Sequence, residues 1–388
     1  MKIVCISHWR FPSEKTMAPY MMRVLEGFAR EGIEVELWAP HRQNSSDLIH
    51  TDPFEYHLIE RNFTLKKLPV IDLMSYRWLG KYSFFLMLGS FITSVFFKML
   101  FMRRRRDTVF YFFDLRDAYM AHWLSDKTFS EIHMYYRSGL DFINRRGFKH
   151  MKGVIAATKP LQTEIMRDYH LPQEKILYAP CGVNFERFGI DTSKEEAREA
   201  LNLPLEEKII LYVGHLFAVK GVDVLFDAHE GLGKGERIYF VGGTDGDIER
   251  YRDKWRAAGS PASIVIAGRK PHQEIPLWLR AADILSIPNT AKEAAGAIES
   301  SPSKLIEYMA SGRPIVASDV PGIRDVLEGD MGFFCEPDSP EAISRAIHEV
   351  LKDSKEAERR AALARIAARG LGWDARAKKI KKFIESKI

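Results

Sequence analysis

Strand-like and helix-like segments alternate along almost all of this 388-residue chain, and this alternation constrains its fold more than any other feature. Short apolar segments at 2–7 and 34–39 enclose residues 20–30, whose apolar positions have helical spacing and which end just before Gly32. A strand, a helix and a second strand in this order imply a parallel pair joined by a right-handed crossover. The sequence therefore predicts an α/β fold with parallel sheets.

The alternation restarts after a charged segment at 191–208, so we expect two αβ sheets in sequence, each of nucleotide-binding type. Further strands are expected at 57–60, 109–113, 131–134, 153–157, 175–179, 209–213, 237–241, 263–267, 284–287, 314–317 and 332–335. Helices of the second half are expected at 222–230, 247–258, 275–282, 303–311, 323–327 and 340–352. This pattern predicts two Rossmann-like domains, 1–185 and 186–365. Residues 366–388 are expected to form a helix that packs back on the first domain.

Composition excludes several classes of protein. Hydrophobic residues make up 46% and charged residues 28%, which is typical of globular proteins and excludes disordered and collagen-like chains. Cys5, Cys181 and Cys335 have no short spacing, so neither structural zinc nor a disulfide framework is expected, and a reducing cytoplasm fits best. The N-terminus lacks the apolar core of a signal peptide.

The net charge of +5 favours phosphate-bearing ligands or an anionic membrane surface. Nucleic acid is not expected as a partner, because only the arginine run at 103–106 and the basic C-terminal tail favour it.

Residues 82–97 form an uncharged apolar segment, followed by Lys98 and by the four arginines at 103–106. A helix of about 16 residues spans roughly 24 Å, less than a hydrocarbon core of about 30 Å. The strand expected next must also join the sheet of the first strand, which argues against a spanning helix. Two interpretations stay open: a buried helix, or a helix lying on the inner face of the cell membrane with the arginines near acidic headgroups.

A loop with two glycines follows the strand expected at 209–213. It contains Gly214, His215 and Lys220 and leads into a helix, so N–H groups, the helix dipole and an ammonium group can favour an anion there. Gly242 and Gly243 form a second turn after the next strand, where a ligand can approach the backbone closely. Because this turn is not a GxGxxG fingerprint, dinucleotide binding is poorly supported.

The segment that starts at Glu299 joins a loop to a helix and then to a buried strand. Ser303 fits as the N-cap of that helix, which would aim the amides of Ser303 and Lys304 at an anion. Glu307 lies about one turn further along, and its carboxylate can accept two hydroxyl hydrogen bonds, as a ribose diol would supply. Glu299 lies upstream in the loop, within reach of a second polyol.

These segments resemble the retaining nucleotide-sugar glycosyltransferases of family 4, also called group 1, which have the GT-B architecture of two Rossmann-like domains facing a central cleft. The resemblance is carried by VGHLFAVKGVDVL at 213–225, VGGTDGDIERY at 241–251, AGRKPHQEIPLWLRAADI at 267–284, EYMASGRPIVASDVPGIRDVL at 307–327 and APCGVNFERF at 179–188. It implies that residues 1–185 bind the acceptor and residues 186–365 bind the donor.

On the donor side, the resemblance implies that Lys220 binds the diphosphate and Glu307 the ribose hydroxyls. It gives Glu299 the hydroxyls of the transferred sugar, and the seven-residue spacing to Glu307 favours Glu299 over Glu293. His215 stands where the family commonly has arginine, so one cation is replaced by a group that is only partly charged near neutral pH. The implied donor-binding residues are Gly214, His215, Lys220, Gly242, Gly243, Arg269, Ser303, Lys304 and Glu307.

On the acceptor side, His133 follows a strand end and resembles a histidine that the family places close to the reacting sugar. Asp114, Arg116 and Asp117 follow the preceding strand and are candidates for orienting the acceptor. Thr16 belongs to the loop before the first helix, which lacks the usual glycine pair of the family.

The resemblance thus implies a retaining hexosyltransferase that uses a UDP- or GDP-sugar and a lipid-linked or envelope-glycan acceptor. His133, Lys220 and Glu299 are its expected catalytic residues, and the leaving phosphate would help to deprotonate the acceptor. No metal or other cofactor is expected, because Lys220 and helix dipoles can supply positive charge. A nucleotide-sugar epimerase of the same architecture and a non-catalytic nucleotide-sugar-binding protein stay open as alternatives.

Overall fold

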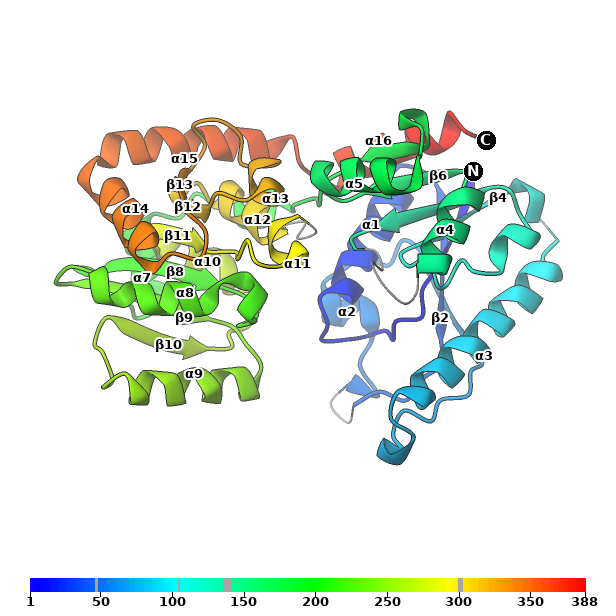
Figure 1. Ribbon diagram of the computed structural model, residues 1–388, viewed down its shortest axis with the longest axis horizontal. Coiled ribbons are helices and arrows are strands. Elements are labelled where there is room, and N and C mark those ends of the chain that lie inside the picture. Colours follow the sequence, from blue (N-terminus) through cyan, green and yellow to red (C-terminus); the bar gives the residue numbers. More distant parts are fainter. Residues whose placement is uncertain (46–47, 104, 135–140, 299–302) are drawn as a thin grey trace. The chain divides into compact units, whose positions relative to one another are not determined.

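The computed structural model describes residues 1–388 apart from 46–47, 104, 135–140 and 299–302. The chain forms two compact units, each built on a parallel sheet with helices around it (Figure 1). The first unit comprises Met1–Ala157, Leu161–Ala179 and Trp373–Ile388, and the second comprises Thr158–Pro160 and Pro180–Gly372. The predicted boundaries at 185 and 365 lie several residues from these divisions, because residues 180–185 and 366–372 belong to the second unit.

The sheet of the first unit has the strand order β3-β2-β1-β4-β5-β6-β7, and all neighbouring strands are parallel. Its strands are β1 (Lys2–Ile6), β2 (Glu34–Pro40), β3 (Thr64–Leu68), β4 (Thr108–Phe112), β5 (Thr128–Ile132), β6 (Gly153–Ala156) and β7 (Ile176–Tyr178). Its helices are α1 (Met17–Arg30), α2 (Pro53–His57), α3 (Lys81–Leu100), α4 (Asp141–His150), α5 (Lys159–Tyr169) and α16 (Trp373–Glu385).

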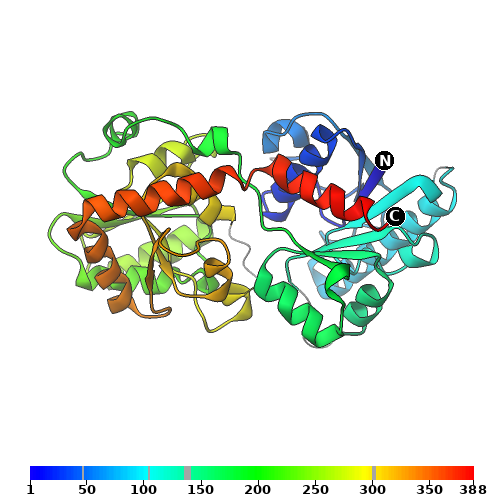
Figure 2. The ribbon, with the colours of Figure 1, turned by 90° about the horizontal axis from the view of Figure 1, so that it is seen from above.

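Both faces of this sheet are buried. Along β1, Ile3 and Cys5 belong to a core shared with α1 and α16, whereas Val4 and Ile6 belong to a core shared with α3, α4 and α5. Burial on both faces explains why strands such as β4 (TVFYF) and β6 (GVIA) are continuous apolar runs. Helix α16 packs against α1 (Figure 2), where Gly27 permits a close approach: a Cβ there would lie 3.1 Å from the Cβ of Ala377.

The sheet of the second unit has the order β10-β9-β8-β11-β12-β13 and is also parallel. Its strands are β8 (Lys208–Val213), β9 (Glu236–Val241), β10 (Ile264–Gly268), β11 (Ile284–Ile287), β12 (Ile315–Ser318) and β13 (Phe333–Cys335). Its helices are α6 (Phe185–Phe188), α7 (Lys194–Ala200), α8 (Val222–Asp227), α9 (Asp245–Ala257), α10 (Ile275–Ala281), α11 (Ala294–Ala297), α12 (Ser303–Ser311), α13 (Pro321–Arg324), α14 (Pro340–Lys352) and α15 (Ser354–Arg369). The predicted α/β class with two parallel sheets is confirmed.

One predicted strand is wrong. Residues 57–60 were expected to be extended, but His57 ends α2, and the neighbouring strand β3 begins only at Thr64. Asp52 explains the difference, because its carboxylate accepts hydrogen bonds from the N–H groups of Phe54 and Glu55 and so caps the helix. The predicted strand at 131–134 is shifted, since β5 ends at Ile132.

Candidate active site

Two glycine loops meet at the carboxyl ends of β8 and β9. A Cβ on Gly242 would lie 2.4 Å from the carbonyl oxygen of Gly214, so only glycine permits this approach. Both residues have positive φ angles, 117° for Gly242 and 137° for Gly214. The N–H of Gly214 donates to the carbonyl oxygen of Val241 over 2.8 Å, which holds the loop against the end of the sheet.

Lys220 lies where the strand order of the second sheet reverses. Strand β8 lies between β9 and β11, and such a topological switch point is where α/β sheets bind their ligands. The next residue, Gly221, has a φ of 65°, and a Cβ there would lie 1.7 Å from the carbonyl oxygen of Pro288. The loop that carries Lys220 is therefore packed directly on the loop that follows β11.

A second ammonium group, that of Lys304, lies near the same loop. Its Nζ atom is 3.8 Å from the ring centre of Tyr212, and a Cβ on Gly214 would lie 2.7 Å from it. Burial and the nearby charge of Lys220 lower the pKa of Lys304 well below its usual value, while the charge of Glu307 acts in the opposite direction. Burial also lowers the pKa of Lys220. The two lysines thus form a partly buried cationic pair that an anion would stabilise.

The imidazole ring of His215 lies near this cationic pair. Burial and the charge of Lys304 lower its pKa, so the imidazole is mainly neutral near pH 7. The ring stacks on Phe217 with 4.9 Å between centroids. Its Nδ1 atom is buried and has no hydrogen-bond partner among the residues that the structure describes.

Helix α12 begins at Ser303 and carries Glu307, whose negative charge partly opposes the lowering of the Lys304 pKa. The hydroxyl of Tyr308 accepts the N–H of Val213 over 2.7 Å, which ties α12 to the end of β8. The predicted sugar contact Glu299 lies outside the described residues. Its competitor Glu293 is exposed and directly precedes α11.

The remaining donor-side candidates line the ends of β9 and β10. Gly243 leads into a capping box in which Thr244 and Asp247 hydrogen-bond each other's N–H groups, so the start of α9 is satisfied internally and is a poor anion site. Arg269 follows β10 and is exposed, and the Nζ atom of Lys270 lies 5.4 Å from the ring centre of Trp278.

In the first unit, His133 follows β5 and bonds to a fully buried carboxylate. Its Nε2 atom lies 2.9 Å from Oε1 of Glu131, which also accepts hydrogen bonds from Tyr20 and from Arg376. The other oxygen of Glu131 accepts the hydroxyl of Tyr111 over 2.6 Å. Burial alone would raise the pKa of Glu131, but the charge of Arg376 and these hydrogen bonds hold it at about 2. His133 is therefore held by a buried carboxylate that is negatively charged near pH 7.

The other acceptor-side candidates lie at the switch point of the first sheet, where β1 and β4 are neighbours. Arg116 forms two hydrogen bonds with Asp114, of 2.6 and 3.0 Å, so these side chains stabilise each other. Asp117 is buried and lies 2.9 Å from Nδ1 of His8, which follows β1. Thr16 is exposed and directly precedes α1.

Sequence reasoning missed the side chain of Lys304, for which only the amide was predicted, and it missed Glu131, Arg376 and His8. Glu131 could have been recognised from the sequence, because a carboxylate inside the buried strand TFSEI needs a cationic partner. His8 could also have been recognised, since it lies in the loop after β1 and Asp117 lies in the loop after the neighbouring strand β4. Within the described part of the chain, no group of three or more His, Cys, Asp or Glu residues could hold a metal ion.

Comparison with known proteins places these residues in context. Residues 193–368 match the family model described as "Glycosyl transferases group 1". A D-inositol 3-phosphate glycosyltransferase of Xylanimonas cellulosilytica is 29% identical over 57% of this chain and 54% of its own length. A putative teichuronic acid biosynthesis glycosyltransferase of Bacillus subtilis is 27% identical over 56% of this chain and 52% of its own length. The chain thus spans about half the length of these relatives.

Solved structures share the fold over the whole chain. Sucrose-phosphate synthase from Thermosynechococcus elongatus superposes with a TM-score of 0.78 at 18% identity, covering 99% of this chain and 98% of that protein. Anabaena HepE in complex with UDP has a TM-score of 0.75 at 16% identity and covers both chains completely. At these identities the likeness shows the fold, which is GT-B.

Proposed function

We propose that this chain is a group 1 glycosyltransferase, whose family model matches residues 193–368, and that it transfers a hexose from a nucleoside diphosphate sugar to a hydroxyl acceptor. The observation that supports this most is the Lys220–Lys304 pair at the switch point of the second sheet, beside Gly214 and His215. Two partly buried ammonium groups suit a diphosphate, whose negative charge grows as it leaves the sugar.

The proposal assigns each donor contact to a group in this unit. Lys220 and Lys304 neutralise the diphosphate, and the neutral ring of His215 lies beside it. Glu307 accepts the ribose hydroxyls, and the backbone around Arg269 frames a uracil or guanine base. Glu299 holds the hydroxyls of the transferred sugar. The lysines supply the positive charge that a metal ion supplies in other phosphate sites, so activity is expected to survive chelation of divalent metals.

On the acceptor side, we assign His133 to the reacting sugar, and Thr16, Asp114 and Arg116 to the acceptor. We propose a lipid-linked or envelope glycan at the cytoplasmic face of the cell membrane as the acceptor, because the first unit exposes aromatic side chains between residues 82 and 101. Retention of the anomeric configuration is part of the proposal, and NMR of the product anomer tests it.

Binding of free UDP and GDP tests the diphosphate site without knowledge of the acceptor. We expect Lys220→Met to weaken binding by about 10- to 100-fold in isothermal titration calorimetry, since a hydrogen bond to a charged group contributes about 1.5–3 kcal/mol. Lys234, an exposed lysine of the same unit, provides the matched control Lys234→Met. Equal affinities for the three proteins would contradict the assignment of Lys220.

A donor screen separates transfer from the two alternatives. Incubation with UDP- and GDP-sugars should release nucleoside diphosphate by slow hydrolysis. A donor that changes its sugar without such release would indicate an epimerase, and binding without either change would indicate a non-catalytic protein. Glu299→Ala should reduce turnover more than it reduces UDP or GDP binding, whereas Glu293→Ala should change neither. If Glu293→Ala reduced turnover and Glu299→Ala did not, the sugar contact would be assigned to Glu293.

A further inference from the structure

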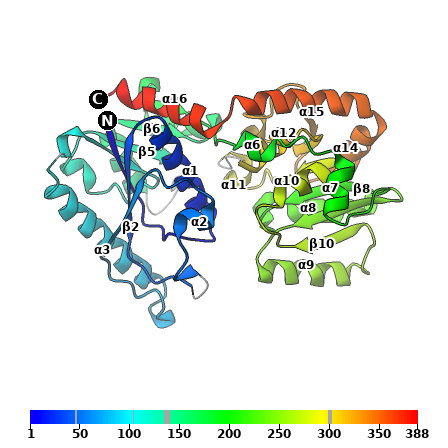
Figure 3. The ribbon, with the colours of Figure 1, turned by 180° about the vertical axis from the view of Figure 1, so that it is seen from behind.

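Helix α3 of the first unit is apolar on both of its faces. Met87, Phe91, Val95 and Met99 recur every four residues and are buried, and the last three belong to the core on one face of the sheet. The opposite side of the helix carries exposed Tyr82, Phe85, Leu86, Phe97 and Leu100. The outward side of a surface helix normally carries polar and charged residues. Figure 3 shows α3 running along the outer side of the sheet of the first unit.

The apolar surface extends beyond the helix itself. Of the 22 exposed large apolar side chains that the structure describes, ten lie within residues 71–101, so they are concentrated in one short segment. We call these ten residues the apolar surface: Ile71, Met74, Tyr76, Trp78, Tyr82, Phe85, Leu86, Phe97, Leu100 and Phe101. Trp78 is 81% exposed and Phe101 is 78% exposed. Exposed apolar patches of this kind mark protein or membrane interaction sites.

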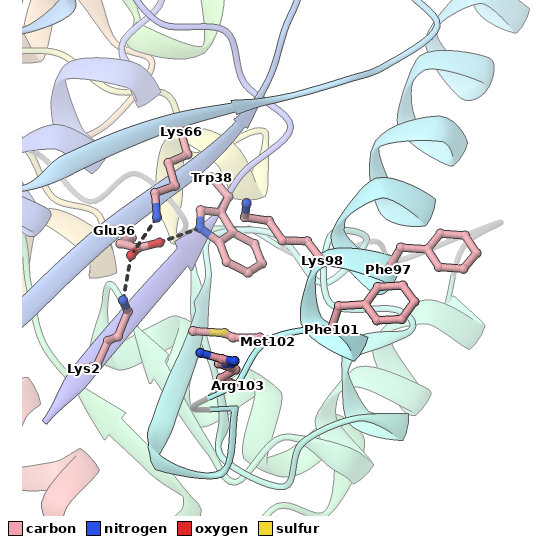
Figure 4. Close-up of a pocket in the computed structure, with 9 residues that line it drawn as sticks. All are labelled: Lys2, Glu36, Trp38, Lys66, Phe97, Lys98, Phe101, Met102 and Arg103. Carbon is pink, nitrogen blue, oxygen red and sulfur yellow. Dashed lines mark hydrogen bonds and ion pairs between the residues drawn. The ribbon is translucent and has the colours of Figure 1, made fainter.

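A pocket of about 540 Å³ lies at the C-terminal end of α3 (Figure 4). Phe97 and Phe101 of the apolar surface form part of its lining, together with Trp38 and Met102. Four basic side chains also line it: Lys2, Lys66, Lys98 and Arg103. The pocket thus joins cationic groups to the edge of the apolar surface.

Two of these four cations are paired with carboxylates within the protein: Lys2 with Glu34 and Glu36, and Lys66 with Glu36. Glu36 lies 2.6 Å from Nζ of Lys2 and 2.9 Å from Nζ of Lys66, and it also accepts the indole N–H of Trp38 over 3.0 Å. In contrast, Lys98 and Arg103 form no ion pair with a carboxylate in the described part of the chain. The Nζ atom of Lys98 lies 5.1 Å from the ring centre of Trp38, and Figure 4 shows this side chain reaching from the helix toward that ring.

The strand connections of the first sheet limit how α3 can contact a bilayer. It is long and apolar enough to span one, and 33% of its most apolar window is buried. However, α3 connects β3 to β4, and both strands belong to the same sheet, so its two ends cannot lie on opposite sides of a membrane. Only its outward side is available, which suits a helix that lies in the membrane plane.

We propose that the apolar surface of residues 71–101 docks on a bilayer of anionic phospholipid, with a headgroup phosphate bound between Lys98 and Arg103 in the adjoining pocket. Trp78, Tyr82, Phe97 and Phe101 insert their rings at the level of the headgroups, where aromatic side chains are favoured. The basic side chains supply attraction to the negative lipid surface. A second copy of this chain would need no cationic pocket at the rim of the contact, so charge favours lipid.

The same docking would bring the acceptor side of the first unit to the lipid surface, a consequence that rests on the proposed function. Phe84, on the N-terminal half of α3, lies 5.8 Å from His8 and 5.5 Å from Arg116 between ring or guanidinium centres. Both residues follow the carboxyl ends of central strands, β1 and β4. One end of α3 therefore touches the acceptor-side residues while the other end lines the basic pocket.

Flotation of the full chain with vesicles tests the docking without any sugar donor, so its result is independent of the proposed transferase activity. We expect binding to vesicles of phosphatidylcholine mixed with phosphatidylglycerol, little binding to phosphatidylcholine alone, and loss of binding between about 0.1 M and about 1 M salt. The variant Lys98→Gln/Arg103→Gln should reduce partitioning roughly 30-fold. The control variant Lys208→Gln/Lys234→Gln, at exposed lysines of the second unit, should bind like the unaltered protein.

The apolar contribution is tested with Phe85→Gln/Phe97→Gln/Phe101→Gln, which changes exposed positions only and should abolish flotation. Its control is Leu363→Gln/Ile366→Gln at exposed positions of α15. Because all three native cysteines are buried, an environment-sensitive dye can be attached selectively to Phe85→Cys or to Leu363→Cys. Anionic vesicles should blue-shift the emission of the dye at position 85 and leave the dye at position 363 unchanged.

Several results would overturn the proposal. Flotation that is absent with anionic vesicles, or unaffected by both variants of the first unit, would exclude this surface as the lipid contact. Binding of soluble glycerol phosphate without flotation would identify a soluble anion as the occupant of the pocket. A dimer in sedimentation velocity that the triple glutamine variant converts to a monomer, again without flotation, would identify a second copy of the chain as the partner.

Discussion

Arg376 and Glu131 form a buried ion pair with 2.7 Å between Nη2 and Oε1, although they lie 245 positions apart in the sequence. Arg376 belongs to α16, the last helix, and Glu131 to β5, an interior strand of the first sheet. The same carboxylate oxygen lies 2.9 Å from His133. The end of the chain therefore takes part in fixing a residue that we assign to the reacting sugar.

Removal of this arginine should destabilise the first unit. Arg376→Ala leaves a buried carboxylate without its cation, and loss of one partner of such a pair costs about 3–5 kcal/mol. Urea denaturation followed by circular dichroism measures the change, and hydrogen exchange of β5 and α1 assigns it to this unit. Lys378→Ala, at an exposed position of the same helix, is the matched control and should be close to neutral. Equal stability of both variants would show that the pair contributes little.

The same pair predicts a dependence of stability on pH. The pKa of Glu131 is about 2 in the folded protein, below its value of about 4.3 in an unfolded chain. A lowered pKa stabilises the folded state above pH 4.3, and this stabilisation is lost as the pH falls toward 2. The difference in unfolding free energy between the unaltered protein and Arg376→Ala should therefore narrow from pH 6 to pH 3. A constant difference over this range would contradict the assigned pKa.

Gly221 is expected to be essential for the packing of the loop that carries Lys220. In Gly221→Ala the new Cβ would lie 1.7 Å from the carbonyl oxygen of Pro288, and φ at this position is 65°. We expect a loss of unfolding free energy of more than about 2 kcal/mol in the second unit. Gly235→Ala separates the steric clash from the backbone strain, because φ there is 84° but no atom lies within 4 Å of the new Cβ. If both variants lose the same stability, the clash at Pro288 is relieved by movement of the loop.

Local pattern was enough to predict most of the fold and part of the site. Gly214 and Gly242 follow apolar strands directly, and Lys220 lies in the loop that begins at Gly214, so a parallel sheet brings these residues to one edge. Helix α2 was missed because its start depends on one capping residue, Asp52, which outweighs the apolar spacing nearby.

Side-chain partners across the fold could not be predicted in the same way. Lys304 was expected to contribute only an amide, but its side chain extends to Gly214, about 90 residues earlier in the sequence. The pairing of Arg376 with Glu131 depends on how α16 packs on α1, which no local pattern specifies. Such contacts are decided by tertiary packing.

Lys304→Met is expected to separate stability from ligand binding. The ammonium group is partly buried and its pKa is lowered by burial and by Lys220, so the folded protein bears an electrostatic cost in holding both charges. Replacement by methionine removes one charge and keeps the length of the side chain, which should raise the unfolding free energy of the second unit by about 0.5–2 kcal/mol. The same change removes a cation from the proposed diphosphate site and should weaken UDP or GDP binding by about 10- to 100-fold.

Urea denaturation and calorimetry measure the two effects on one sample, with Lys234→Met as the exposed control. A variant that loses stability as well as affinity would show that Lys304 supports the loop structurally, and unchanged affinity would remove it from the site.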